Sequence, residues 1–105
     1  MIRVVIESPY AGDTEKHIQY ARKCIKDSLR RGESPIASHL LYTQKDILDD
    51  LIPYERELGI NAGLAWVEVA ERHVFYVDYG WSSGMKRALK LAQKGKIEIV
   101  HRRIL

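Results

Sequence analysis

Residues 74–85, VFYVDYGWSSGM, decide the fold class of this chain. Val74–Val77 form an unbroken apolar run, which is typical of a strand buried on both faces. Asp78–Gly84 are mostly turn-forming and small residues, so they predict a loop. Beyond the loop, apolar residues recur at the spacing of one helix face until a stop at Gly95: Met85, Ala88, Leu89 and Ala92. A buried strand that leads directly into an amphipathic helix is the repeating unit of α/β domains.

Three more strands and two more long helices complete the pattern. The predicted strands are residues 2–7, 35–39 and 97–100. The predicted helices are residues 14–31, capped by Asp13 or Thr14 and followed by Gly32, and residues 54–70, preceded by Pro53. Thr43-Gln44-Lys45-Asp46 has the form of a capping box, and it predicts a further short helix containing Ile47 and Leu51.

The resulting order, β-α-β-α-α-β-α-β, predicts a small doubly wound parallel sheet of about four strands with helices on both faces. We expect one domain over residues 1–105, because a chain of this length has no room for a second core. Four strands make a small sheet. We therefore expect a second subunit to cover an exposed edge or helix face.

Composition excludes several classes of protein. The chain is 46% hydrophobic and 30% charged, which are ordinary values for a globular protein and not for a disordered one. No apolar run is long enough for a membrane span, and the first residues lead into a strand without the features of a signal peptide. The single cysteine, Cys24, cannot form an internal disulfide, so we expect a reducing, cytoplasmic location. A net charge of +3 is spread too thinly to favour nucleic-acid binding.

The candidate binding site lies where the predicted strands end. In open α/β sheets, ligands bind beyond the carboxyl ends of the strands. This rule brings three groups of residues together: Glu7, Ser8, Tyr10 and Gly12; Ser38 and His39; Asp78, Ser82, Ser83 and Gly84. The last group opens a helix, whose free N–H groups and dipole favour a phosphate or a carboxylate. Tyr10, Tyr79 and Trp81 flank the same place, and aromatic rings suit a nucleobase or a sugar.

Each of these residues also has a structural interpretation. Ser82 or Ser83 caps any helix, Asp78 can simply fix a turn, and a lone histidine such as His39 is more often structural. We expect Trp66 to pack in the core, and His17 and His73 to be solvated. The glycine pattern matches neither a P-loop nor a dinucleotide fingerprint, and no histidines and cysteines have metal-ligand spacing. The sequence therefore predicts neither a cofactor nor a metal.

Three segments resemble the nucleoside 2-deoxyribosyltransferase-like superfamily, which includes nucleotide N-glycoside hydrolases, and especially its small phage-type members. The segments are ESPYAG at 7–12, SHLLY at 38–42 and VDYGWSSGM at 77–85. The resemblance implies a flavodoxin-like (Rossmann-like) fold and a homodimer or higher homo-oligomer. It also implies that the first loop contacts the base and sugar of a nucleotide, that Asp78 contacts the sugar, and that Ser82 and Gly84 bind a 5′-phosphate.

The same resemblance implies a glutamate nucleophile on the helix after the last loop, and Ala88 stands at that position. Alanine cannot attack an anomeric carbon. The first hypothesis that the resemblance implies is an N-glycoside hydrolase or deoxyribosyltransferase with Asp78 and position 88 as its catalytic positions, and the second is a nucleotide sensor or sponge. The alanine has three explanations: a binding protein without hydrolase activity, a Glu→Ala variant of an enzyme, or an enzyme that uses Glu7 or Glu55 instead. Arg87 beside it could add affinity for a phosphate. A third, weaker hypothesis is an oligomeric interaction protein that has lost its ligand.

Overall fold

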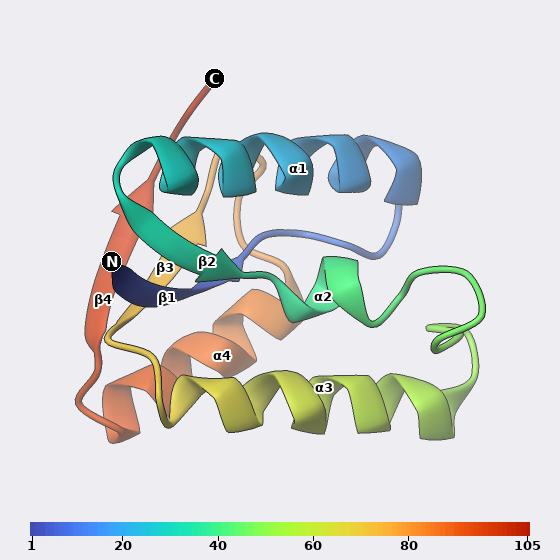
Figure 1. Cartoon of the computed structure of the whole chain (residues 1–105). Coiled ribbons are helices and arrows are strands. Elements are labelled where there is room, and N and C mark those ends of the chain that lie inside the picture. Colours follow the sequence, from blue (N-terminus) through green and yellow to red (C-terminus); the bar gives the residue numbers. More distant parts are fainter.

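The computed structural model describes all residues, 1–105, and its centre is a four-stranded parallel sheet (Figure 1). The strands are β1 (Ile2–Glu7), β2 (Glu33–Ile36), β3 (Arg72–Tyr76) and β4 (Glu98–Arg102). Their order in the sheet is β2-β1-β3-β4. Val5 of β1 pairs with His73 of β3, and His73 pairs with Ile99 of β4, so one row of paired residues runs across these three strands. The order reverses between β1 and β3, as in flavodoxin-like doubly wound sheets.

Helices cover both faces of the sheet, as predicted. They are α1 (Thr14–Arg30), α2 (Ser38–Leu41), α3 (Pro53–Val67) and α4 (Ser83–Lys94). In Figure 1, α1 lies above the sheet, whereas α3 and α4 lie below it. Side chains cap two of these helices: Asp13 accepts a hydrogen bond from the Lys16 N–H, and Ser82 accepts one from the Met85 N–H.

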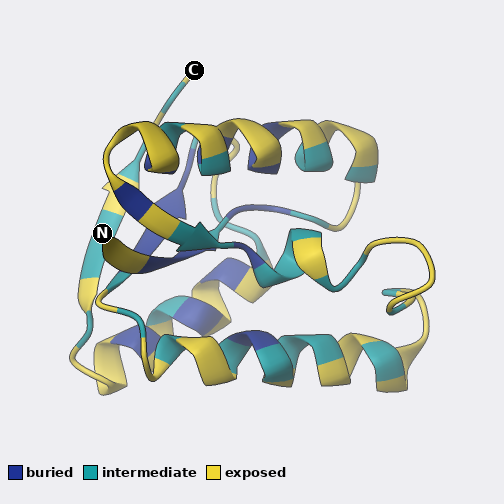
Figure 2. Cartoon of the chain, in the orientation of Figure 1, coloured by how far each residue is buried: buried dark blue, intermediate teal, exposed yellow.

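Two apolar clusters join these layers, and Figure 2 shows their buried residues on the strands and on the inner sides of α1 and α4. The cluster under α1 comprises Val4, Ile6, Tyr20, Cys24, Ala37, Val74 and Tyr76. The cluster between α4 and the sheet comprises Phe75, Val77, Met85 and Ala88. The predicted strand over 74–77 is therefore buried on both faces, because its alternate residues enter different clusters. No helix is both long enough and apolar enough to cross a bilayer.

A buried ionic network lies at the edge of the α1 cluster. Glu33 is 2% exposed. Its carboxylate accepts hydrogen bonds from Arg102 at 2.6 and 2.7 Å, from Arg72 at 2.6 Å and from Ser28 at 2.7 Å. The Arg102 hydrogen bonds, reinforced by those of Ser28 and Arg72, outweigh burial and lower the pKa of Glu33 to about 2. Glu33 therefore stays charged inside the protein.

The prediction of a short helix containing Ile47 and Leu51 was wrong. The short helix is α2, and residues 42–52 form turns. Asp46 has φ 67°, which is incompatible with a right-handed helix. The Thr43 hydroxyl donates to the His39 carbonyl at 2.6 Å, so it closes α2 instead of capping a later helix.

Other boundaries and two side chains also differ from the prediction. The second strand occupies Glu33–Ile36 and not 35–39, and α3 ends at Val67 and not at residue 70. His73 was expected in solvent but is fully buried. Trp66 was expected in the core but is 45% exposed. His73 can be buried because the carboxylate of Glu7, at the end of the neighbouring strand β1, pairs with it. The spacing of apolar residues in the sequence does not reveal such a pair.

Candidate functional site

A cavity of about 360 Å³ opens at the carboxyl end of β1, between α2, α3 and α4. This volume is at the small end of the range for small-molecule sites. The first wall comes from the end of β1 and from α2: Glu7, Ser8, Tyr10, Ala11, Ser38, His39, Tyr42 and Thr43. The second wall comes from α3 and the start of α4: Glu55, Arg56, Gly59, Ile60, Gly63, Leu64, Ser82, Ser83, Gly84, Met85, Arg87 and Ala88. Leu48 and Asp50 complete the lining.

The start of α4 forms one end of the cavity and presents free hydrogen-bond donors. Ser82 accepts from the Met85 N–H at 3.2 Å. The N–H groups of Ser83 and Gly84, in the first turn, have no acceptor within the helix. Arg87 lies one turn further and also lines the cavity, with Glu57 3.2 Å away. Two free N–H groups, a helix dipole and a guanidinium together suit an anion.

Glu7 contributes a carboxylate to the opposite wall. It is the last residue of β1, and the His73 Nε2 lies 3.2 Å from its Oε1. His73 is fully buried on β3, so it holds the Glu7 side chain in a fixed place. The other carboxylate oxygen has no hydrogen bond from the protein. Glu7 is therefore a positioned carboxylate with an oxygen available to a ligand.

Ser8 and His39 form a second polar pair in the cavity wall. The Ser8 Oγ lies 2.7 Å from the His39 Nε2, and Ser8 is 4% exposed. Burial lowers the pKa of His39, and the nearby Glu7 charge opposes this only partly, so the imidazole is neutral at pH 7. A neutral imidazole has one donor and one acceptor nitrogen. Ser8 uses one of the two, and the other, Nδ1, is buried without a protein partner.

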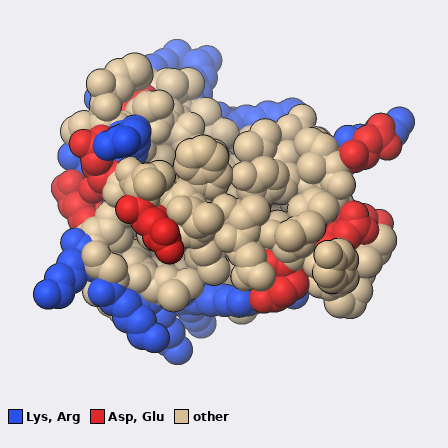
Figure 3. Space-filling model, turned by 60° about the horizontal axis from the view of Figure 1, so that its bottom comes forward, with Lys and Arg blue, Asp and Glu red and all other residues tan.

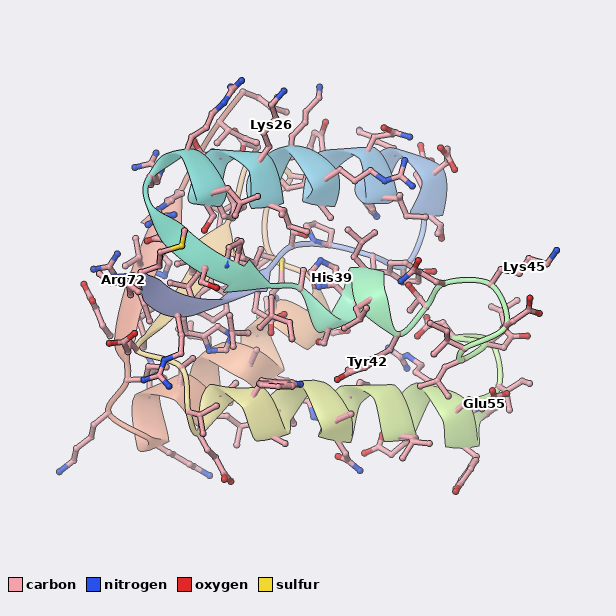
Figure 4. The ribbon with its side chains drawn as sticks, in the orientation of Figure 1. Lys26, His39, Tyr42, Lys45, Glu55 and Arg72 are labelled. Carbon is pink, nitrogen blue, oxygen red and sulfur yellow. The ribbon has the colours of Figure 1, made fainter.

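Two glycines bring α3 close to α2. A Cβ on Gly63 would clash with Ser38, at 2.8 Å from the Ser38 Cβ and nearer still to its hydroxyl oxygen. A Cβ on Gly59 would meet the end of the Leu48 side chain at 3.2 Å and the Tyr42 Cβ, at the end of α2, at an ordinary contact distance of 4.0 Å. Beside these contacts, the Trp66 indole donates to the Tyr42 hydroxyl at 3.0 Å. Figure 4 shows Tyr42 between α2 and α3 and His39 nearer the sheet, while Lys45 points away from both.

Most of the predicted binding residues meet in this cavity. Those that line it are Ser8, Tyr10, His39, Ser82, Ser83, Gly84 and Ala88. Gly12 does not, and it borders a neighbouring hollow formed with residues 43–51. Ala88 is 3% exposed, so its methyl group belongs both to the cavity wall and to the core beneath it.

Asp78 lies outside the cavity lining. Its carboxylate accepts hydrogen bonds from the Tyr20 hydroxyl at 2.6 Å and from the backbone N–H groups of Ile104 and Leu105 at 3.0 Å. Tyr79 and Trp81, which were predicted to flank the site, do not line the cavity. The Tyr79 ring lies 4.6 Å from Tyr20 and the Trp81 ring 5.2 Å from Phe75, between ring centroids. The sequence could not reveal that the end of the chain returns to this loop.

The wall formed by α3 was missed by the sequence analysis. Arg56, Ile60 and Leu64 were not predicted to line a site. Gly59 and Gly63, four residues apart, were the available signal, because they mark a face of α3 that another element approaches closely. Glu55, which was considered as an alternative carboxylate, also borders the cavity. No three His, Cys, Asp or Glu side chains are grouped so as to hold a metal ion.

The fold and the cavity define an α/β domain of flavodoxin-like topology with a pocket, lined by both polar and apolar groups, at the switch point of its sheet. The domain family of unknown function DUF7768 matches residues 2–102, so the chain belongs to that family. No curated protein matches the chain.

Proposed function

We propose that this protein binds a nucleoside 5′-monophosphate in the cavity between α3 and α4. The observation that supports this most strongly is that one cavity joins the free N–H groups of Ser83 and Gly84, with Arg87, to the polar pairs at the end of β1. The first end suits a phosphate, and the second offers donors and acceptors for a sugar and a base. The resemblance noted in the three loop segments favours the same ligand.

In this proposal the phosphate lies on the first turn of α4, and the nucleoside extends toward Ser8 and His39. The Ser8–His39 pair supplies the polar surface beside the nucleoside, and the Tyr10 ring supplies an apolar one. Loss of water from such a site strengthens each hydrogen bond.

We propose further that the protein acts as a nucleotide sensor or sponge, because Ala88 replaces the glutamate that the resemblance implies. No step of glycoside cleavage can use a methyl group as a nucleophile. With the lone Cys24 buried, a reducing cytoplasmic compartment is the location that we propose. A phage origin remains part of the same hypothesis.

Calorimetric titration with a panel of nucleosides and their 5′-monophosphates, in ribo and deoxy forms, tests the binding proposal. We expect at least one monophosphate to bind at least about tenfold more tightly than its nucleoside, because charge-assisted hydrogen bonds are worth about 1.5–3 kcal/mol each. Equal affinities for the two forms, or no binding of any member, would refute it.

A second candidate function is N-glycoside hydrolysis with Glu7 as the nucleophile, and the observation that favours it is the positioned Glu7 carboxylate in the cavity wall. The carboxylate would attack the anomeric carbon as the base leaves, and water would then release the sugar and restore Glu7. A chromatographic assay for free base separates the two functions. Release by the unmodified protein but not by Glu7→Gln would support hydrolysis. Release only by Ala88→Glu would support a binding protein whose site lacks its nucleophile.

A further inference from the structure

The outer side of α3 is apolar and uncovered. Tyr54, Leu58 and Ala65 are exposed at the spacing of one helix face, and Val69 follows just beyond the helix end. Asn61 is the only polar residue in this row. Figure 3 brings the lower side of the molecule forward and shows a broad uncharged surface with acidic and basic groups mainly around its margin. We call these five residues the α3 stripe.

The side of α3 that faces the sheet also buries little of the helix. Gly63 is its only buried residue, whereas α1 buries four residues and α4 buries three. Part of its inner side borders the cavity rather than packed side chains. Most helical stability in proteins comes from packing of an apolar face, so an isolated monomer leaves α3 poorly supported.

The apolar residues of the α3 stripe and their exposed neighbours Leu51, Ile52 and Trp66 form a patch that is smaller than a whole dimer interface but comparable to the apolar part of one. Tyr54 and Trp66 are 76% and 45% exposed, and Leu51, Ile52, Leu58 and Val69 lie between 44% and 91%. With aromatic side chains burying about 150–250 Å² each and aliphatic ones less, the patch presents roughly 300–600 Å². A standard interface buries about 800 Å² on each partner, a little over half of it apolar. The patch can therefore supply the apolar part of such an interface.

The order of residues in the α3 stripe is complementary to a second copy of itself. In an antiparallel pair of α3 helices that cross at Asn61, Tyr54 lies within one residue of the level of Val69 of the other copy, and Leu58 lies within one residue of the level of its Ala65, so large residues meet smaller ones. The two Asn61 side chains meet at the two-fold axis, and an amide has the donor and the acceptor to pair with its own copy. An asparagine in an apolar seam is known to fix register.

We propose that two copies of this chain associate through the α3 stripe, antiparallel and centred on Asn61. This pairing covers the exposed side of the helix that forms one wall of the cavity. It does not depend on the identity of the ligand, so it stands or falls independently of nucleotide binding.

Analytical ultracentrifugation of the unmodified chain, Leu58→Lys and Leu29→Lys tests the proposal. Leu58 lies in the stripe but does not line the cavity, and Leu29 is similarly exposed on α1. We expect a dimer for the unmodified chain and for Leu29→Lys, and a monomer for Leu58→Lys with the helical circular dichroism signal retained. A monomeric unmodified chain at high micromolar concentration, or a dimer that survives Leu58→Lys, would overturn it.

Cross-linking gives a second test that does not require the dimer to be broken. Burial makes Cys24 inaccessible and raises the pKa of its thiol to about 12, so an introduced cysteine is the only reactive one. With a short bis-maleimide, we expect Asn61→Cys to give a covalent dimer and Leu29→Cys to stay monomeric. Equal cross-linking of the two variants would contradict a two-fold axis at Asn61.

Discussion

Asp78 is the residue whose role differs most between sequence and structure. Its carboxylate links the loop after β3 to Tyr20 of α1 and to the backbone of the last two residues. Burial opposes ionisation of Asp78, but the hydrogen bonds from Tyr20 and from these N–H groups together lower its pKa. A carboxylate with these partners stabilises the fold, and it has little capacity left for a sugar.

We therefore predict that Asp78→Ala lowers the free energy of unfolding by about 1–3 kcal/mol, because it leaves the Tyr20 hydroxyl without its acceptor. The affinity of the folded variant for a nucleoside monophosphate should be unchanged. Urea denaturation and calorimetric titration measure the two quantities. Normal stability of Asp78→Ala together with much weaker ligand binding would contradict this prediction and would show that Asp78 contacts the ligand.

Glu33 makes stability depend on pH. Its pKa is about 2 in the folded protein, chiefly because of the Arg102 hydrogen bonds, against an ordinary value of 4.5. A depressed folded-state pKa contributes stability that is present above pH 4.5 and is lost as the pH falls toward 2. We expect the stability of the unmodified chain to fall over this window in urea denaturation. Glu33→Gln should be less stable at pH 7 and should show a shallower fall, and identical pH profiles would contradict this.

At the scale of the element, α3 depends on two glycines that have different surroundings. We predict that Gly63→Ala is destabilising and weakens ligand binding, since its methyl group would push α3 away from Ser38 in the cavity wall. Gly59→Ala is the matched control, because its one tight contact is with the movable end of Leu48 and it gains about 1 kcal/mol of helix propensity. Thermal unfolding of both variants checks this. Equal effects on stability would show that the close approach at Gly63 is unimportant.

The elements themselves differ in how far the sequence predicts them. The strand β3, predicted at 74–77 and observed at Arg72–Tyr76, and the helix α4 were predictable because their apolar residues and caps are local signals. The turns at 42–52 were not, because Thr43 satisfies a carbonyl of α2 and Asp46 adopts a left-handed conformation. A capping-box pattern identifies residues that can cap a helix, but it does not show which backbone groups they hydrogen-bond in the folded protein.

At the scale of the whole molecule, the alternation of strands and helices was enough to predict a parallel sheet with helices on both faces. The same rule placed Ser8, His39 and Ser83 at one edge of the sheet, and the structure brings them into one cavity. The contribution of α3 to the cavity wall could not be predicted from the rule that ligands bind at strand ends. It depends on the direction in which α3 packs on the sheet, which the sequence does not reveal. The buried pair of Glu7 and His73 also depends on strand register, which a single sequence does not reveal.

Phosphate binding by the first turn of α4 is the central claim, and the affinity of Ser83→Pro for a nucleoside monophosphate tests it most directly. Proline is favoured at the first position of a helix, and Ser82, with φ −78° and ψ 166°, already has the conformation that precedes proline. The substitution removes one free N–H group, whereas the control Ser83→Ala removes only the hydroxyl. We predict that Ser83→Pro loses about tenfold or more in affinity for the monophosphate that the unmodified chain binds, while Ser83→Ala retains it. Unchanged affinity of Ser83→Pro would contradict the claim.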